Sequence, residues 1–573
     1  MSKTSFFNRA VFKRNLRGYW PLWAVYLGAM ILLIPIPLHS NLMYGYNETA
    51  VSLAQDYFSQ SLTISLVIGA FFAIFATMSV FSYMYTPRSA NMTASLPVRR
   101  ETFFSTNFLT VMIMVVAVHV ITALAVVLTI LIFDAKMLLI LPLLQWIVLG
   151  ILMTMFFVCL SFFCATLTGN ILILPCIYGV INFAVVCINS LLAYVFSDFL
   201  YGYSHYSVPE SVMWLTPAVN LVRTTTRSAK ILEGASYINF NGMPEIIVYT
   251  VAGVFFLMIG FLIHKHRRTE SASDIVAVKP LKPVVKFFFA AVGSLTLGLL
   301  IDELFFGYII GDFVPTIVSM LIGGFVGYFG SEMLVAKSFK VWNKWKGFAV
   351  YGLVVILFIT GLAFDIAGFE TSIPHENTII SADVDIYGEY LDGDDDEIIQ
   401  TVIALHEFII ENRNKEIDYD GNVAAVDISY KLKNGATVKR SYYCNIPDFI
   451  VETYNSPERC YQRIALSDEF NYLGIETATI EYYDGNEWQV TPLTEEQFYT
   501  LYNCMISDIG HSSVGKVDLG LNANTTQEAF VLTADFKISE YSGYYYFYQR
   551  IPVDAINCIT YLDSLEIEYA PVY

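Results

Sequence analysis

Nine runs of mostly apolar residues follow one another along the first 369 positions of the chain. Each run comes close to or exceeds the ~20 residues that a helix needs to cross the hydrocarbon core of a bilayer. The runs lie at about Trp20–Leu38, Leu62–Tyr83, Phe108–Phe133, Leu138–Ala165, Ile171–Phe196, Ile246–His264, Lys286–Phe306, Val314–Gly330 and Phe348–Phe364. The pattern predicts a polytopic α-helical membrane protein with about nine transmembrane helices.

The pattern changes at about residue 370, where alternating strands and amphipathic helices replace the apolar runs. Two stretches about 105 residues apart, 426–447 and 532–552, share one order: two alternating strands followed by Ile-Pro. A short helix is expected after each. The first hairpin turns at Asn434-Gly435, a pair typical of a type I′ turn. Such self-similarity predicts an internal duplication.

Each hairpin is preceded by a strand and an amphipathic helix. The apolar spacing predicts these helices at about Asp395–Asn412 and Thr494–Ile509. Thr494 and Gln497 have the spacing of a capping box, which would start the second helix. The C-terminal part is therefore expected to be an α+β domain.

Charge divides the chain at the same place. The 573 residues are 55% hydrophobic and only 15% charged, well below the roughly 25% charged residues of soluble domains. Residues 370–573 hold 36 acidic and 11 basic side chains, whereas residues 1–369 hold 15 acidic and 22 basic ones. The acidic part would repel phosphate, so nucleic-acid binding is not expected.

The basic residues set the expected orientation. With the N-terminus inside, 18 of the 22 basic residues before position 370 fall on the inner side, as the positive-inside rule requires. We therefore expect a multi-pass cell-membrane protein with a cytoplasmic N-terminus and an extracellular C-terminal domain. The expected parts are an interfacial helix at 1–19, a six-helix core at 20–268, three additional transmembrane helices at 269–369 and the α+β domain at 370–573, with repeat halves at about 378–460 and 470–565.

The N-terminal segment interleaves apolar and basic residues. A helix with this pattern would lie on the anionic inner leaflet of the bilayer. Its basic residues are Lys3, Arg9, Lys13, Arg14 and Arg17.

The loop after the second run carries a short basic motif with Leu-Pro-Val followed by Arg-Arg-Glu. Its residues of interest are Arg88, Leu96, Pro97, Arg99, Arg100 and Glu101. With the interfacial helix and six runs, this loop resembles the membrane-spanning permease subunits of type-2 ATP-binding cassette (ABC) exporters, over about residues 5–268. The extra helices and the outer domain resemble a subgroup of bacterial permeases with C-terminal extracellular extensions.

The resemblance implies partners as well as a fold. In that family the loop carries a coupling helix that docks into a separate ABC-type ATP-binding subunit, and here the segment would be Arg88–Glu101. It also implies a second permease subunit, identical or different. This chain would bind no cofactor, and ATP and Mg²⁺ would be held by the partner subunit.

Three motifs that could carry chemistry fail on their details. Gly510–Lys516 matches a phosphate-binding loop, but Val517 replaces the hydroxyl residue that binds Mg²⁺. Asp392–Glu397 lacks the glycine of a calcium-binding EF-hand loop. His406-Glu407 lacks the second histidine of a zinc protease helix, so the sequence predicts neither a metal site nor an enzyme.

Four cysteines lie in the expected outer domain, namely Cys444, Cys460, Cys504 and Cys558. Four cysteines allow three pairings, and free thiols are an equal alternative. Elsewhere, His119 inside the third run is expected to be a neutral histidine that is hydrogen-bonded to a neighbouring helix. Gly323, Gly327 and Gly330 have the spacing of close helix packing.

Two functions follow from these features. The first is a transport subunit that couples ATP hydrolysis by its partner to export of a substrate. The second is a membrane sensor whose extracellular domain binds a ligand or an envelope component and signals inward.

Overall fold

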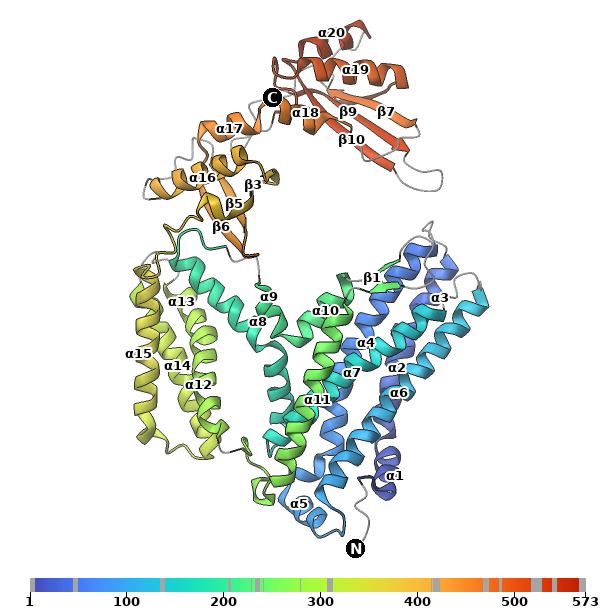
Figure 1. The fold of residues 1–573 in the computed structure, drawn as a ribbon, viewed down its shortest axis with the longest axis vertical. Coiled ribbons are helices and arrows are strands. Elements are labelled where there is room, and N and C mark those ends of the chain that lie inside the picture. The colour runs from blue at the N-terminus through green and yellow to red at the C-terminus, as the bar shows by residue number, and fades with distance from the viewer. Residues whose placement is uncertain are drawn as a thin grey trace. The chain divides into compact units, whose positions relative to one another are not determined.

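The computed structural model describes residues 6–565 with internal gaps. The residues left out within that range are 45–49, 134–139, 205–207, 228, 232–237, 241, 279, 307–312, 414, 416–422, 467–473, 484–486, 517–527 and 538–543. The chain divides into two compact units (Figure 1). The helical unit comprises Met1–Val195 and His205–Ala363, and the sheet unit comprises Phe196–Ser204 and Phe364–Tyr573.

The helical unit consists almost entirely of α-helices. Their bounds are α1 Arg9–Gly18, α2 Trp20–Leu33, α3 Pro35–Tyr44, α4 Ala50–Val80, α5 Pro87–Ala94, α6 Arg100–Phe133, α7 Ile140–Leu167, α8 Ile173–Phe199, α9 Glu210–Trp214, α10 Pro217–Arg227, α11 Met243–His266, α12 Leu281–Gly293, α13 Leu299–Phe306, α14 Phe313–Ala336 and α15 Trp345–Ala363. A two-stranded ribbon, β1 Ala229–Ile231 and β2 Ile238–Phe240, lies between α10 and α11.

Within the described residues, nine helical stretches are long and apolar enough to cross a membrane, as the sequence predicts. Large apolar side chains are exposed along them, including Val25 at 71%, Leu124 at 63% and Val251 at 64%. Exposed apolar side chains on long helices are typical of lipid-facing surfaces, since a soluble protein would bury them. These helices suggest a multi-pass membrane protein.

Two of the nine stretches are not single α-helices. The first is interrupted at Ile34, which lies between the end of α2 and Pro35, the first residue of α3. The seventh contains a π-helical turn, Ser294–Gly298, between α12 and α13. A proline that lacks its amide hydrogen explains the first break.

Glycines let α12 and α14 pack closely. A side chain at Gly323 would overlap the backbone of Gly293, and one at Gly327 would overlap the backbone of Phe289. Gly330 has nothing within 4 Å of a would-be side chain. The close packing expected from the glycine spacing is therefore confirmed for two of the three positions.

The sheet unit contains two four-stranded antiparallel sheets. The first has the order β4-β3-β5-β6 and the second β8-β7-β9-β10, so the two halves share one topology. The strands are β3 Ile379–Ile386, β4 Glu389–Gly393, β5 Val423–Leu432, β6 Thr437–Asn445, β7 Gly474–Tyr483, β8 Trp488–Pro492, β9 Glu528–Lys537 and β10 Tyr544–Pro552. This matches the duplication expected from the sequence.

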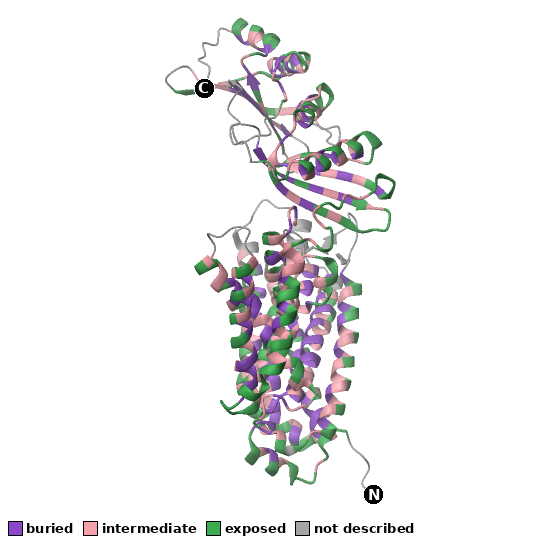
Figure 2. Ribbon diagram, turned by 90° about the vertical axis from the view of Figure 1, so that its left-hand side faces the viewer, coloured by how far each residue is buried: buried purple, intermediate pink, exposed green. Residues whose placement is uncertain are grey.

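Helices follow the second and fourth strand of each sheet. They are α16 Asp396–Glu411, α17 Asp448–Tyr454, α18 Pro457–Ile464, α19 Glu495–Asp508 and α20 Ile556–Ser564. The capping box of Thr494 and Gln497 forms as predicted. Buried and exposed residues alternate along β5 because one face of its sheet packs on the core (Figure 2).

The hairpin at Asn434-Gly435 forms with a different turn from the one expected. The amide of Gly435 donates to the Leu432 carbonyl at 2.9 Å, and only Gly435 of the turn has a positive φ, +82°. This geometry is a type I turn followed by a left-handed glycine, not a type I′ turn. The predicted turn type is therefore wrong, although its position is right.

Candidate functional site: the loop between α4 and α6

The loop between α4 and α6 forms a short 3-10 turn, Ser82–Met84, followed by the eight-residue helix α5. Pro87 starts α5, and its fixed φ suits the first helical position. Ser89 donates from its hydroxyl to the Tyr83 carbonyl at 3.0 Å, which holds α5 against the end of α4. α5 lies at the same end of the helical unit as α1 and the C-terminal end of α11 (Figure 1).

One side of α5 is buried and the other presents apolar side chains to solvent. Ala90 is 9% exposed, whereas Met92 is 70% exposed and Leu96, just after the helix, is 41% exposed. The arginines that flank this surface, Arg88 and Arg99, are also exposed. We call the surface formed by Arg88, Met92, Leu96, Pro97 and Arg99 the α5 surface.

Arg99, Arg100 and Glu101 have different roles in the structure. Within the described chain, the exposed guanidinium of Arg99 makes no hydrogen bond or ion pair, so it is available to a partner. Arg100 donates to the carbonyl of Arg267, which follows α11. Glu101 pairs with Lys265 at 2.8 Å. The start of α6 is thus joined to the end of α11.

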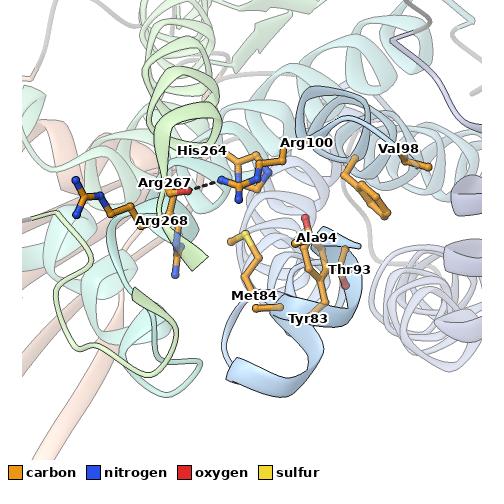
Figure 3. Close-up of a pocket in the computed structure, with 11 residues that line it drawn as sticks. Tyr83, Met84, Thr93, Ala94, Val98, Arg100, His264, Arg267 and Arg268 are labelled. Atoms are coloured by element: carbon orange, nitrogen blue, oxygen red, sulfur yellow. Dashed lines mark hydrogen bonds between the residues drawn. The ribbon is translucent and has the colours of Figure 1, made fainter. Parts of the chain in front are cut away.

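A hollow of about 90 Å³ lies behind α5, between this helix, the start of α6 and the end of α11 (Figure 3). Its lining residues are Tyr83, Met84, Ala90, Thr93, Ala94, Val98, Arg100, Phe103, His264, Arg267 and Arg268. Burial raises the pKa of the Tyr83 phenol well above its usual value, so this side chain stays protonated and can donate. The hollow combines three arginines with apolar walls.

The helix predicted near the N-terminus forms as α1, with Asn8 capping its N-terminus. Val11 and Asn15 are its buried residues, whereas its basic side chains, Arg9, Lys13, Arg14 and Arg17, are exposed. Lys3 lies outside the described residues.

A chain of amide groups ties α1 to two long helices. The Asn15 amide donates to Asn107 of α6 at 2.7 Å, and the Asn107 amide donates to the Val80 carbonyl at the end of α4 at 3.1 Å. Because Asn15 is fully buried, this chain fixes α1 against the two helices that flank the α5 loop.

A second, larger cavity of about 450 Å³ lies among α4, α7, α8 and α10. Its lining is almost entirely apolar, and its rim includes Phe71, Phe75 and Phe183, which are 63%, 52% and 47% exposed. Asn182 is buried in its wall, and the amide oxygen of this residue has no hydrogen-bond partner in the described chain. The cavity could hold an apolar molecule that carries one hydrogen-bond donor.

His119 is fully buried in α6, and its ring Nδ1 lies 3.0 Å from the Val115 carbonyl one turn earlier. The ring packs between Tyr26 and Trp146. A side chain at Gly150 would overlap the ring, so this glycine makes room for it. The hydrogen-bond partner belongs to the same helix, not to the neighbouring helix that the sequence suggested.

The sheet unit holds the remaining candidate residues. All four cysteines are free thiols in the structure, two buried (Cys460 and Cys558) and two half-buried (Cys444 and Cys504). Burial raises the pKa of the Cys444 thiol to about 12. In the described ranges, no group of three or more His, Cys, Asp or Glu side chains has the arrangement of a metal site.

The segment that matches a phosphate-binding loop follows α19, a helix and not a strand. The backbone amide of Ser513 donates to the carboxylate of Asp554 at 2.8 Å, which a phosphate would need to displace. A side chain at Gly515 would overlap α18, so the loop packs against its own unit. Val517 lies outside the described residues.

His406 lies in a buried polar network that sequence analysis did not anticipate. Its two ring nitrogens lie 3.1 Å from the Tyr430 hydroxyl and 2.8 Å from the Tyr442 hydroxyl. Burial, together with the nearby charge of Arg440, lowers the pKa of His406 to about 4. The histidine is therefore neutral at pH 7.

The segment after α8 adds to the edge of the first sheet. The amide of Ser441 in β6 donates to the Gly202 carbonyl at 3.2 Å, and Tyr203 forms a β-bridge with Arg440. The Tyr201 amide donates to the Glu370 carboxylate at 3.1 Å. This long-range pairing also has no local sequence signal.

Comparison with protein-family models, with curated proteins and with solved structures finds no match for this chain.

Proposed function

We propose that this chain is the permease subunit of an ABC exporter and that a separate ATP-binding subunit docks on the α5 surface. The observation that carries the proposal is the 70% exposure of Met92 on α5, a helix held against the end of α4 by the bond from Ser89 to the Tyr83 carbonyl. An exposed apolar residue flanked by arginines is typical of a protein-binding surface. The end of the unit that bears α5 would face the cytoplasm, because the basic residues of α1, α5, α6 and α11 gather there.

The contacts around α5 offer a route for movement. A shift of the loop would pull on α11 through two contacts of α6, the ion pair of Glu101 with Lys265 and the bond from Arg100 to the Arg267 carbonyl. The amides of Asn15 and Asn107 would carry the shift to α1 and α4. ATP and Mg²⁺ would be held by the partner, and this chain would supply the moving helices.

The apolar cavity among α4, α7, α8 and α10 supports an apolar or amphiphilic substrate. A cavity of this size suits a small molecule, and its single unpartnered amide oxygen at Asn182 would accept one hydrogen bond.

One observation favours the alternative of a membrane sensor. The Tyr201–Tyr203 segment follows α8 directly and pairs with β6 of the sheet unit. A ligand that changed this sheet would therefore pull on α8. The sensor function differs from the exporter function in needing no ATP turnover.

Capture of the ATP-binding subunit tests the proposal. Met92→Glu should leave the amount and melting temperature of the purified chain unchanged, because the side chain is exposed. It should weaken capture of an ATP-hydrolysing partner from native membranes by about 10- to 100-fold. This factor corresponds to the free energy of burying one methionine side chain at the interface. Asn91→Glu adds the same charge at the neighbouring exposed position and is the matched control. Equal capture by wild type and Met92→Glu would refute docking on this surface.

Arg99→Lys tests the arginine of the α5 surface separately. A planar guanidinium can bind a carboxylate of the partner with two parallel bonds, which an ammonium cannot do. We expect about tenfold weaker capture, while Arg17→Lys on α1 should have no effect. Unchanged capture by Arg99→Lys would remove this contact from the proposal.

A further inference from the structure

We propose that the hollow behind α5 binds an anionic phosphate group, as carried by the headgroup of an acidic phospholipid or by a soluble phosphate. The hollow is distinct from the α5 surface, because its lining lies on the opposite, packed side of that helix. Figure 3 shows Arg100, His264 and Arg267 on one side of it, across from Tyr83, Met84, Thr93 and Ala94, whereas the Arg268 side chain points away from this group.

Three polar atoms of residues that line the hollow have no hydrogen-bond partner in the described chain. They are the hydroxyl of Tyr83, Nδ1 of His264 and Nη2 of Arg267, and each is buried. His264 as a whole is only 5% exposed. Buried polar groups in proteins are nearly always satisfied, so three unsatisfied ones around one hollow point to a group that accepts hydrogen bonds from them.

The rest of the Arg267 side chain is held in place. Its Nε donates to the Ser271 hydroxyl at 3.2 Å, and its Nη1 donates to the Ala165 carbonyl at 3.1 Å. Within the described part of the chain, Nη2 is therefore the one nitrogen of this fixed guanidinium that lacks a partner. A fixed guanidinium loses little freedom when it binds an oxyanion.

Charge around the hollow favours an anion. None of the eleven described residues that line it is acidic. Glu101, at the start of α6, is paired with Lys265 at 2.8 Å. Asp274, in the segment after α11, is paired with Lys337 at 2.8 Å. Among the described residues, no carboxylate forms an ion pair with the arginines that line the hollow.

The size and walls suit a phosphate that carries an apolar body. The volume of about 90 Å³ exceeds several times the roughly 10–15 Å³ that one water needs. Met84, Val98 and Phe103 give the hollow apolar walls. Basic pockets between membrane helices on the cytoplasmic side are a known way to bind acidic headgroups.

Titration of the purified full chain in detergent tests the proposal. The probes are dihexanoyl phosphatidylglycerol, dihexanoyl phosphatidylcholine and inorganic phosphate, and binding is followed as a shift of the thermal unfolding midpoint. Phosphatidylglycerol should bind at least about tenfold more tightly than phosphatidylcholine. If inorganic phosphate binds as tightly as phosphatidylglycerol, the site takes a soluble anion; if it binds much more weakly, the site takes a lipid. Equal binding of the two lipids would overturn the proposal.

A matched pair of variants places the binding in the hollow. Tyr83→Phe and Tyr85→Phe each remove a buried hydroxyl without a hydrogen-bond partner, but only Tyr83 lines the hollow. Tyr83→Phe should weaken binding severalfold and Tyr85→Phe should not. Arg267→Gln should weaken it at least about tenfold. Equal binding by both tyrosine variants would refute the site, and this holds even if Arg267→Gln fails to fold. The ATP-binding subunit is absent from the experiment, so loss of docking on the α5 surface would leave this result unaffected.

Discussion

Acid should destabilise the sheet unit through His406. The folded state holds the pKa of this histidine at about 4, against about 6.5 for an unfolded chain. Between pH 6.5 and pH 4, His406 therefore binds a proton in the unfolded state but not in the folded state. Stability falls as pH decreases from 6.5 to 4 and then levels off. A difference of about 2.5 pKa units corresponds to roughly 3 kcal/mol, of which about 2 kcal/mol is lost by pH 5.

The measurement uses one polypeptide that joins residues 196–204 to 364–573 through a glycine–serine linker, so that the strand segment after α8 is retained. Trp488 is its only tryptophan and reports urea unfolding. His406→Gln keeps hydrogen-bonding capacity toward Tyr430 and Tyr442 but does not titrate. The stability difference between wild type and this variant should shift by about 2 kcal/mol against wild type between pH 7 and pH 5. Parallel pH profiles of the two proteins would refute the reasoning.

Three further outcomes are expected. Glu332→Gln in the full chain should cost about 3 kcal/mol in thermal unfolding, because a carboxylate only 5% exposed accepts from Lys286 and Lys344 at 2.9 Å each; an unchanged melting temperature would contradict this. In the linked polypeptide of residues 196–204 and 364–573, Gly202→Ala should lower the stability more than Gly368→Ala does. Both glycines have a positive φ, but only at Gly202 would the new methyl group overlap Tyr442. Single cysteines introduced at 394–397 should react with an impermeant thiol reagent in intact cells and those near position 340 should not; equal labelling at both sites would end the proposed orientation.

The sequence predicted the elements whose signals are local. In the described part of the chain, the runs of about 20 apolar residues correspond to nine long helical stretches, and the repeat in the C-terminal part corresponds to two sheets of one topology. The types of the turns were harder to predict from the sequence. The positive φ values that define a type I′ turn occur at Tyr387-Gly388, between β3 and β4. Tyrosine rarely adopts a positive φ, so the residue type at position 387 did not predict this turn.

The missing parts of the prediction depend on segments far apart in the chain. Arg100 and Glu101 were identified as candidates, but their contacts with the end of α11 are tertiary contacts that no local pattern encodes. The hollow behind α5 results from the same packing. Likewise, Gly202 and Tyr203 lie just beyond the predicted run Ile171–Phe196, yet they pair with β6 more than 230 positions later. Only folding brings such groups together.

A photo-crosslinking amino acid placed at position 92 gives the most direct test of docking on the α5 surface. Met92 is 70% exposed, so the replacement should not disturb folding, and the crosslinker reacts only with what lies against α5 in living cells. Position 366 in the sheet unit, where Ile366 is 79% exposed, is the control. The account predicts an adduct from position 92 that contains an ATP-binding subunit and is absent from position 366. An adduct without such a subunit, or the same adduct from both positions, would contradict it.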